Sequence, residues 1–196
     1  MSSPSKHSRG KPQSSLRIIG GTWRSRRLPI IEADGLRPSA DRIRETLFNW
    51  LQADVRGARC LDLFAGTGAL GLEALSRGAS FVQFNELNPK VERQLSANLQ
   101  LLTLDPSRAK SHCQNSVQWL DQSTDKPYDI VFIDPPFAAK LWDESFKVLE
   151  HRKLLADRAL IYVESPRDTK LQLPENWEIL REKSSGSLSY RLCCAN

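Results

Sequence analysis

Several features are missing from this sequence. None of its 196 positions begins a run of about 18 apolar residues, which is the length that a membrane-spanning helix needs. The first 15 residues are polar and contain no apolar segment of the kind found in secretory signals. The four cysteines and three histidines show neither a C-x-x-C pair nor a spacing typical of zinc ligands. We therefore expect a cytoplasmic protein with no membrane span and no metal site, in which Cys60 and Cys113 are reduced core thiols.

Acidic residues are also missing from the N-terminal segment. The chain carries 28 Lys and Arg against 23 Asp and Glu, a net charge of +5. Seven of the cations precede Glu32, the first acidic residue, so the remainder holds 21 cations against 23 acids. A basic arm on a nearly neutral domain is typical of proteins that bind a polyanion, most often nucleic acid. A solvated leader has the same composition, and charge alone does not separate the two.

The character of the sequence changes twice along the chain. Residues 1–15 are rich in Ser, Pro, Lys and Arg, which predicts a flexible basic tail. Residues 16–35 contain two short apolar runs around a Gly-Gly pair, which predicts a β-hairpin with a glycine turn. The main domain is expected over residues 36–196, and it opens with a helix at 39–51, where apolar residues recur at helical spacing.

From residue 59 onward, short apolar segments alternate with helical ones. The expected strands are 60–64, 81–84, 109–114, 129–133 and 159–163. One expected helix ends near residue 77, and two others cover 89–102 and 141–155. Residues 177–192 offer two further strands that turn near 184–187. This order predicts an α/β fold with a doubly wound, mostly parallel sheet of seven strands, ending in an antiparallel C-terminal hairpin.

A glycine-rich motif follows the first of these strands. Gly66, Gly68 and Gly71 form G-x-G-x-x-G between a strand and a helix, the context of a nucleotide-binding loop. Glu86 stands 20 residues after Gly66, at the end of the next strand, where a carboxylate can hold ribose hydroxyls. Asp62 places a second carboxylate beside the loop, which disfavours a pyrophosphate and suits an ammonium or sulfonium group. The motif therefore favours S-adenosylmethionine over a dinucleotide, although a tight strand–helix turn would show the same glycines.

Residues Asp134-Pro-Pro-Phe137 follow directly after the most apolar strand. Ligands bind at the carboxyl ends of the strands in a doubly wound sheet, so this tetrapeptide should face the glycine loop. The Asp134 carboxylate and a proline carbonyl, Pro135 by preference, can accept both N–H bonds of an exocyclic amine and aim its lone pair at a methyl group. Phe137 offers a face on which a base can stack. The pattern predicts these three residues as catalytic, whereas a simple proline turn would require no such role.

Together, the two motifs resemble class I methyltransferases that act on amino nitrogens. The segments Arg17-Ile-Ile-Gly-Gly-Thr-Trp-Arg24 and Leu36-Arg-Pro-Ser-Ala-Asp-Arg-Ile-Arg-Glu-Thr-Leu-Phe-Asn49 resemble, more narrowly, the RsmD family. The likeness extends to Leu192. It implies a Rossmann-like class I fold and the transfer of a methyl group from S-adenosylmethionine to the exocyclic N2 amine of a guanine in 16S ribosomal RNA. S-adenosylhomocysteine would be the product, and small-subunit RNA or the assembled small subunit would be the partner.

The resemblance also assigns roles to individual positions. The residues expected to bind the cofactor are Asp62, Phe64, Ala65, Gly66, Thr67, Gly68, Glu86, Asn115, Ser116 and Arg37. The residues expected to bind RNA are Arg17, Arg24, Arg26 and Arg27 of the hairpin, together with Arg44. The chain departs from the family pattern at Ser39, where Thr is usual, and at Ser25, where the hairpin often has Gly. The second departure leaves the backbone geometry of the hairpin open.

Two other functions are compatible with the same motifs. Asp-Pro-Pro-Phe also occurs in DNA adenine-N6 and cytosine-N4 methyltransferases, but those enzymes need a target-recognition region for which this chain has little length to spare. A non-catalytic RNA-binding factor of ribosome assembly would carry the same basic arm but would not bind S-adenosylmethionine. We see no added interaction element in the sequence and expect a monomer.

Overall fold

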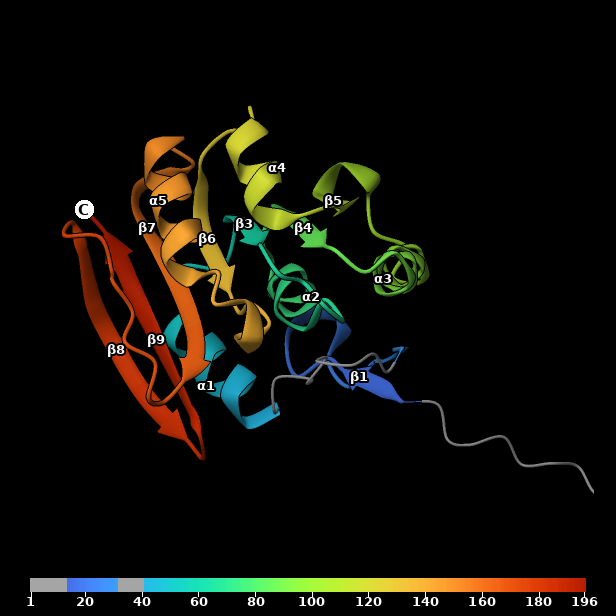
Figure 1. The fold of residues 1–196 in the computed structure, drawn as a ribbon. Coiled ribbons are helices and arrows are strands. Elements are labelled where there is room, and N and C mark those ends of the chain that lie inside the picture. Colours follow the sequence, from blue (N-terminus) through green and yellow to red (C-terminus); the bar gives the residue numbers. More distant parts are fainter. Residues whose placement is uncertain (1–13, 32–40) are drawn as a thin grey trace, which may run out of the picture.

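A seven-stranded sheet forms the centre of the computed structural model, which describes residues 14–31 and 41–196 (Figure 1). The strand order is β5-β4-β3-β6-β7-β9-β8. The strands are β3 (Arg59–Asp62), β4 (Phe81–Glu86), β5 (Ala109–Cys113), β6 (Tyr128–Ile133), β7 (Leu155–Pro166), β8 (Trp177–Ser185) and β9 (Leu188–Ala195). Strands β3 to β7 are parallel, and β9 pairs antiparallel with both β7 and β8. The predicted class I methyltransferase fold with its C-terminal hairpin is confirmed.

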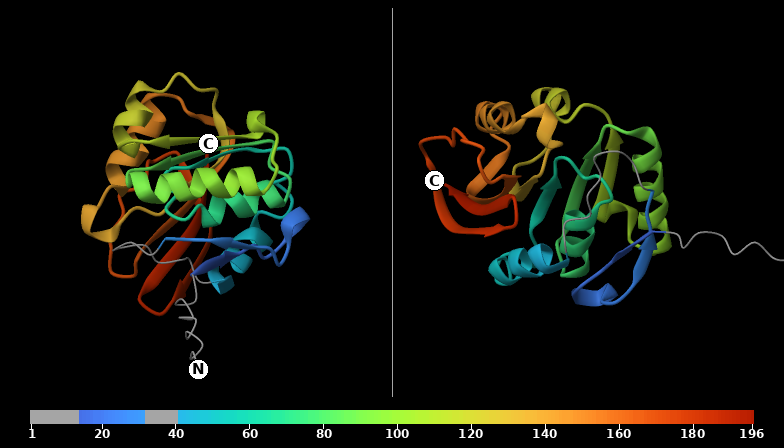
Figure 2. Two further views of the ribbon diagram at one scale, coloured as in Figure 1. Left: turned by 90° about the vertical axis from the view of Figure 1, so that its right-hand side faces the viewer. Right: turned by 60° about the horizontal axis from the view of Figure 1, so that its bottom comes forward.

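Helices cover both faces of this sheet (Figure 2). They are α1 (Asp41–Trp50), α2 (Ala69–Ser76), α3 (Pro89–Leu101), α4 (Ser116–Gln122) and α5 (Trp142–His151). Successive side chains of a strand point to opposite faces, so each buried strand feeds two cores. Phe84, Phe132 and Tyr162 belong to the core beneath α1 and α2, whereas Val131 and Ile161 belong to the core beneath α4 and α5. This two-sided burial explains why β6 is apolar nearly throughout.

The N-terminal hairpin consists of β1 (Ser15–Arg17) and β2 (Arg27–Pro29), as predicted, but its turn differs. The connection covers residues 18–26 and contains a 3₁₀ turn, Gly21–Trp23, in place of a tight glycine turn. Gly21 has a φ of 75°, and a Cβ there would overlap the Ser76 carbonyl group of α2. The glycine therefore allows the hairpin to approach α2 rather than closing the turn. Ser25, at the position where the family often has Gly, has a φ of 67°.

Element boundaries differ from the expected ones at several places. Helix α4 was not predicted, because it is only 7 residues long and too short to show helical periodicity. Strand β7 extends well beyond the expected 159–163. The helix expected at 39–51 is observed as α1, and residues 39 and 40 lie outside the described ranges.

The cysteines are free, and they differ in burial. Cys60 is buried in the centre of the sheet, as expected. The expectation for Cys113 was wrong, because β5 is an edge strand and leaves this thiol exposed. Within residues 14–31 and 41–196, no helix is long and apolar enough to cross a membrane, and no three His, Cys, Asp or Glu side chains are grouped as metal ligands would be.

Candidate active site

Three carboxylates meet at the carboxyl ends of neighbouring parallel strands. Asp62 is the last residue of β3, Glu86 is the last residue of β4, and Asp134 directly follows β6. In the sheet, Asp62 pairs in register with Phe84 of β4 and with Phe132 of β6. Glu86 and Asp134 each follow two residues after these partners of Asp62. The negative charge of Asp62 acts on Asp134, and that of Glu86 acts on Asp62. The fold thus brings together the two motifs that the sequence analysis identified separately.

The backbone N–H groups of the three glycines in this motif already have partners. The Gly66 N–H donates to Glu86 Oε2 at 2.8 Å, and the Gly71 N–H donates to Asp62 Oδ2 at 2.9 Å. The Gly68 N–H is bonded to a carbonyl within the loop. A bound pyrophosphate normally uses such N–H groups at the start of a helix. Because carboxylates accept two of these three N–H groups and a carbonyl accepts the third, the loop favours a cationic ligand over a phosphate.

Two of the loop glycines are required by packing. Gly68 precedes α2 with a φ of 78°, and a Cβ at this position would overlap Leu95 of α3. A Cβ on Gly71 would overlap the ring of Phe84 on β4. The glycines therefore let the loop and the first turn of α2 lie directly against β4 and α3.

Burial changes the proton affinity of Asp62. Its side chain is buried, which raises its pKa to about 7 even though the Gly71 N–H favours the ionised form. The negative charge of Glu86 adds to this rise in the pKa. A buried carboxyl with two acidic neighbours is stabilised in its ionised form by a bound cation.

The residues after β6 line the other side of this site. Asp134 is half-buried, and Pro135 is buried. The Pro136 carbonyl accepts the Ala139 N–H at 2.9 Å, which begins a 3₁₀ turn at Phe137–Ala139. The Pro135 carbonyl accepts no hydrogen bond from the described residues. An ionised Asp134 and this free carbonyl therefore provide two acceptors in adjacent positions.

The ring of Phe137 is half-buried and rests on α5. Its centroid lies 6.1 Å from that of Trp142, with 32° between the ring planes. The Trp142 indole N–H in turn donates to the Glu164 carbonyl oxygen at 2.8 Å, which ties α5 to β7. Sequence reasoning identified Phe137 but missed Trp142, which holds this ring in place.

Burial and neighbouring negative charge both act on Asp134. Loss of hydration contributes most to the rise in its pKa, followed by the charges of Glu164 and Asp62. Asp134 is thus a stronger base than an ordinary aspartate.

The remaining candidate cofactor residues lie in the loop or at the start of α4. Ala65 and Thr67 are buried, and Phe64 is half-buried. Asn115 caps α4, because its Oδ1 accepts the N–H groups of residues 117 and 118 at 3.0 and 3.1 Å, while Ser116 is buried in the first turn. The side-chain amide of Asn115 remains able to donate. Arg37 lies outside the described residues.

Comparison with known proteins shows the same fold and a similar sequence over nearly the whole chain. The family model described as Conserved hypothetical protein 95 matches residues 16–194. Ribosomal RNA small subunit methyltransferase D of Haemophilus influenzae is 46% identical over 92% of this chain and 94% of its own length. The Escherichia coli K12 protein of the same name is 49% identical over 90% of this chain and 88% of its own length. This chain belongs to the RsmD family of methyltransferases.

A solved structure supports the same assignment. The protein yhhF from Escherichia coli superposes with a TM-score of 0.85 at 44% sequence identity, and the match covers 93% of this chain and 98% of that one. The family identified from the sequence motifs is confirmed.

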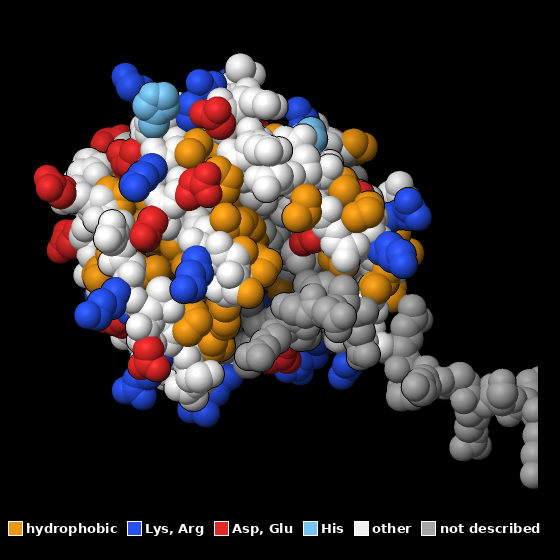
Figure 3. Space-filling model, in the orientation of Figure 1, with side chains coloured by type: hydrophobic (Ala, Val, Ile, Leu, Met, Phe, Trp, Pro, Cys, Tyr) orange, Lys and Arg blue, Asp and Glu red, His pale blue; other side chains and the backbone are white. Residues whose placement is uncertain are grey.

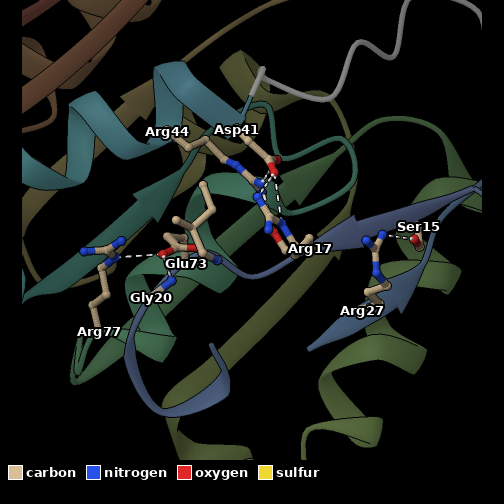
Figure 4. Close-up of polar contacts among 9 residues, drawn as sticks. Ser15, Arg17, Gly20, Arg27, Asp41, Arg44, Glu73 and Arg77 are labelled. Atoms are coloured by element: carbon tan, nitrogen blue, oxygen red, sulfur yellow. Dashed lines mark hydrogen bonds and ion pairs between the residues drawn. The ribbon is translucent and has the colours of Figure 1, made fainter. Parts of the chain in front are cut away.

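The N-terminal hairpin of this RsmD chain is fixed to α1 by ionic contacts (Figure 4). Arg17 Nη2 lies 2.7 Å from Asp41 Oδ2, and Arg44 Nη2 lies 2.6 Å from Asp41 Oδ1. Arg44 also donates to the Arg17 carbonyl oxygen at 2.9 Å. The expectation that Arg44 contacts RNA needs correction, because its side chain is fully buried and joins the hairpin to α1.

The other hairpin cations are exposed. Arg26 donates to the Leu101 carbonyl at the end of α3 at 2.6 Å, and Arg27 donates to Ser15 Oγ at 3.3 Å. The Arg24 side chain is exposed and forms no hydrogen bond or ion pair with the described residues. Arg24 and Arg27 are therefore the hairpin cations least committed to internal contacts.

A buried carboxylate that the sequence analysis missed holds the hairpin against α2 (Figure 4). Glu73 accepts the Ile19 and Gly20 N–H groups, each at 2.8 Å, and lies 2.7 Å from Arg77 Nε. The available signal was an acidic residue in the otherwise apolar sequence of α2. Glu164 gave the same kind of signal in β7, where it is 4% exposed and accepts the Tyr162 hydroxyl at 2.7 Å.

Proposed function

We propose that this chain transfers a methyl group from S-adenosylmethionine to the N2 amine of a guanine in 16S ribosomal RNA. The observation that carries the proposal is the pair of acceptors at the end of β6, the Asp134 carboxylate and the free Pro135 carbonyl, facing a loop whose glycine N–H groups are already bonded. Relatives at 46% and 49% identity are named Ribosomal RNA small subunit methyltransferase D, which supports ribosomal RNA as the substrate.

The loop has the chemistry that S-adenosylmethionine requires. Asp62 would lie near its positively charged methionine part, alongside residues 64–68. Glu86 uses one oxygen for the Gly66 N–H and the other for the Asn88 N–H, and the remaining lone pairs can accept ribose hydroxyls. Asn115 and Ser116 would contact the adenine, and Arg37 would close over the cofactor. When bound, the cofactor supplies an electrophilic methyl group.

The acceptor site would activate the amine by positioning it. A guanine N2 amine has two N–H bonds, which match the acceptors at Asp134 and Pro135. Holding both protons in the acceptor plane directs the nitrogen lone pair toward the methyl group, and Phe137 would stack on the base. Neither the positioning of the amine nor the stacking of the base forms a covalent bond between RNA and protein.

RNA binding is assigned to the N-terminal segment. We propose that residues 1–15 form a basic tail, that the hairpin within 16–35 contacts RNA, and that 36–196 form the methyltransferase domain. Among the described residues on the face drawn in Figure 3, cations stand mostly singly and alternate with acids, with hydrophobic side chains between them. This face offers no continuous basic surface for a polyanion. Arg24 and Arg27 are exposed and are the hairpin cations least committed to internal contacts, which favours them as phosphate contacts.

The test is transfer of a labelled methyl group to unmodified 16S RNA, to assembled small subunits and to DNA, followed by mapping of the product nucleoside. We expect N2-methylguanosine in RNA. Asp134→Ala should reduce kcat at least 100-fold with unchanged cofactor binding by calorimetry. Label on DNA alone would favour the DNA methyltransferase, and no binding of S-adenosylmethionine would favour a non-catalytic assembly factor.

The hairpin assignment has its own measurement. Arg24→Gln with Arg27→Gln should weaken RNA binding and reduce the slope of log K against log salt by about 0.7 to 0.9 for each lost phosphate contact. Arg158→Gln, an exposed cation on β7, is the matched control. An unaltered salt slope in the double variant would show that the hairpin does not contact RNA.

A further inference from the structure

The buried carboxylate Glu164 has no role in the function proposed above, and its position is unusual. It lies on β7, next to β6 in the sheet, and only 4% of its surface is exposed. Charged side chains are rarely this buried unless they are paired with an opposite charge. Among the described residues, its side-chain partner is the Tyr162 hydroxyl, which is neutral. Within residues 14–31 and 41–196 no cation pairs with Glu164, and a carboxylate so placed calls for a functional explanation.

The register of the sheet sets Glu164 beside Asp134. Ile133 of β6 pairs with Val163 of β7, so the next residue on each strand is Asp134 and Glu164, respectively. Neighbouring strands are about 4.8 Å apart, and in-register side chains share a face. The preceding pair on the same face, Phe132 and Tyr162, shows this directly, with ring centroids 6.5 Å apart.

Three contacts hold Glu164 in this position. Its Oε2 accepts the Tyr162 hydroxyl at 2.7 Å, and its carbonyl accepts the Trp142 indole N–H at 2.8 Å. Its backbone also pairs with Tyr190 on β9. The side chain therefore cannot move away from Asp134 without breaking a buried hydrogen bond.

We propose that Glu164 is a positioning residue for methyl transfer, which keeps the neighbouring Asp134 carboxylate basic enough to take the proton released from the acceptor nitrogen. The inference rests on the proposed function, because it assumes that Asp134 accepts an amine N–H. In the reaction the nitrogen lone pair forms the new bond to the methyl carbon, and the bond from that carbon to sulfur breaks with its electron pair staying on sulfur. One N–H bond then breaks, its electron pair returns to nitrogen, and the proton passes to Asp134 and on to solvent.

The charges around Asp134 support this role. Loss of hydration raises the pKa of Asp134, and the negative charges of Glu164 and Asp62 raise it further. Burial also raises the pKa of Glu164, while the Tyr162 hydroxyl favours its ionised form. Tyr190 of β9 pairs in register with Glu164 and contributes to the raised pKa of Tyr162. The nearby cation Arg191 is paired with Glu182 and Ser165. Two carboxyls held side by side are harder to ionise together, which increases the basicity of each.

The first test measures the basicity of Asp134 without any substrate. Carboxyl carbon NMR of the full chain follows the titration of Asp134 in the wild type and in Glu164→Gln, whose amide oxygen can still accept the Tyr162 hydroxyl. We expect the Asp134 midpoint to fall by about 1 to 3 pH units in the variant. Tyr162→Phe should also lower the Asp134 midpoint, but by less. Without the hydrogen bond from the Tyr162 hydroxyl, Glu164 is neutral more often and its negative charge acts less on Asp134. An unchanged or raised midpoint in Glu164→Gln overturns the proposal.

The second test measures kcat for methyl transfer to RNA as a function of pH. In Glu164→Gln the acid limb of the kcat profile should move to lower pH. The kcat on the plateau should fall about 10-fold, with KM for RNA unchanged. Glu164→Asp, which keeps the charge, should restore the position of the limb. Glu178→Gln, which removes an exposed carboxylate from β8, should match the wild type in both tests. A purely structural role would lower stability without moving the limb, and that result overturns the proposal.

The two tests separate this inference from the proposed function. If the wild type fails to methylate guanine but Asp134 titrates as expected, the function is wrong and the coupling between the two carboxyls stands. If the wild type methylates guanine N2 while Glu164→Gln leaves the Asp134 midpoint unchanged, only the inference fails.

Discussion

Glu73→Gln is predicted to release the N-terminal hairpin from the methyltransferase core. In the wild type one carboxylate oxygen accepts the Ile19 N–H, and the other accepts both the Gly20 N–H and Arg77 Nε. A glutamine replaces one of these oxygens with an NH₂ group, so at least one buried backbone N–H loses its acceptor. That loss costs about 1 to 3 kcal/mol, and the weaker bond to Arg77 adds about 1 kcal/mol.

The effect should be local. Leu16, Ile18 and Leu28 still bury their side chains against the core, so the hairpin should open more often without the domain unfolding. If the free energy of opening the hairpin falls by about 2 to 4 kcal/mol, amide exchange at Ile19 and Gly20 should become about 30- to 1000-fold faster.

Hydrogen exchange measured residue by residue is the direct assay. Glu45→Gln, which removes an exposed carboxylate on α1, is the matched control and should leave exchange unchanged. If Glu73→Gln leaves the Ile19 and Gly20 amides as protected as in the wild type, Glu73 does not hold the hairpin and the reasoning fails.

Three further predictions concern the active site. Phe137→Ala should raise KM for RNA about 10-fold through the loss of about 1 to 3 kcal/mol of stacking, and saturation kinetics equal to the wild type would contradict this. Gly71→Ala should lower the free energy of unfolding by about 1 to 3 kcal/mol, because the new methyl group overlaps the ring of Phe84, and a denaturant titration that superimposes on the wild type would refute it. Because the pKa of Asp62 is raised to about 7 in the folded protein, its ionisation opposes folding, so the wild type should lose stability relative to Asp62→Asn as the pH rises from about 4 to about 7. Binding of S-adenosylmethionine measured by calorimetry should strengthen over the same range, and pH-independent affinity would exclude an ionised Asp62 as its partner.

Much of the fold follows from local sequence. Apolar segments separated by helices specify parallel strands with both faces covered, and the carboxyl ends of parallel strands lie at one edge. That rule is enough to bring Asp62, Glu86 and Asp134 together, although 72 residues separate the first from the last. The catalytic and cofactor candidates could be proposed for this reason, because each lies next to a recognisable strand.

Other roles were set by contacts between distant segments, and these could not be read from the sequence. Arg44 was expected to bind RNA, but the packing of the hairpin on α1 buries it. Asn115 resembled a ligand residue, but it also caps a helix too short to predict.

The sequence by itself determined the chain order of the strands and of the helices other than α4, the family, and the edge of the sheet at which the glycine-rich and Asp-Pro-Pro-Phe motifs meet. Only the tertiary structure decided which charged side chains are buried and which neighbours they have. Glu73 and Glu164 show the reason: hydrophobic periodicity records which face of an element is covered, whereas the partner of a buried carboxylate depends on the register and approach of segments far away in the chain.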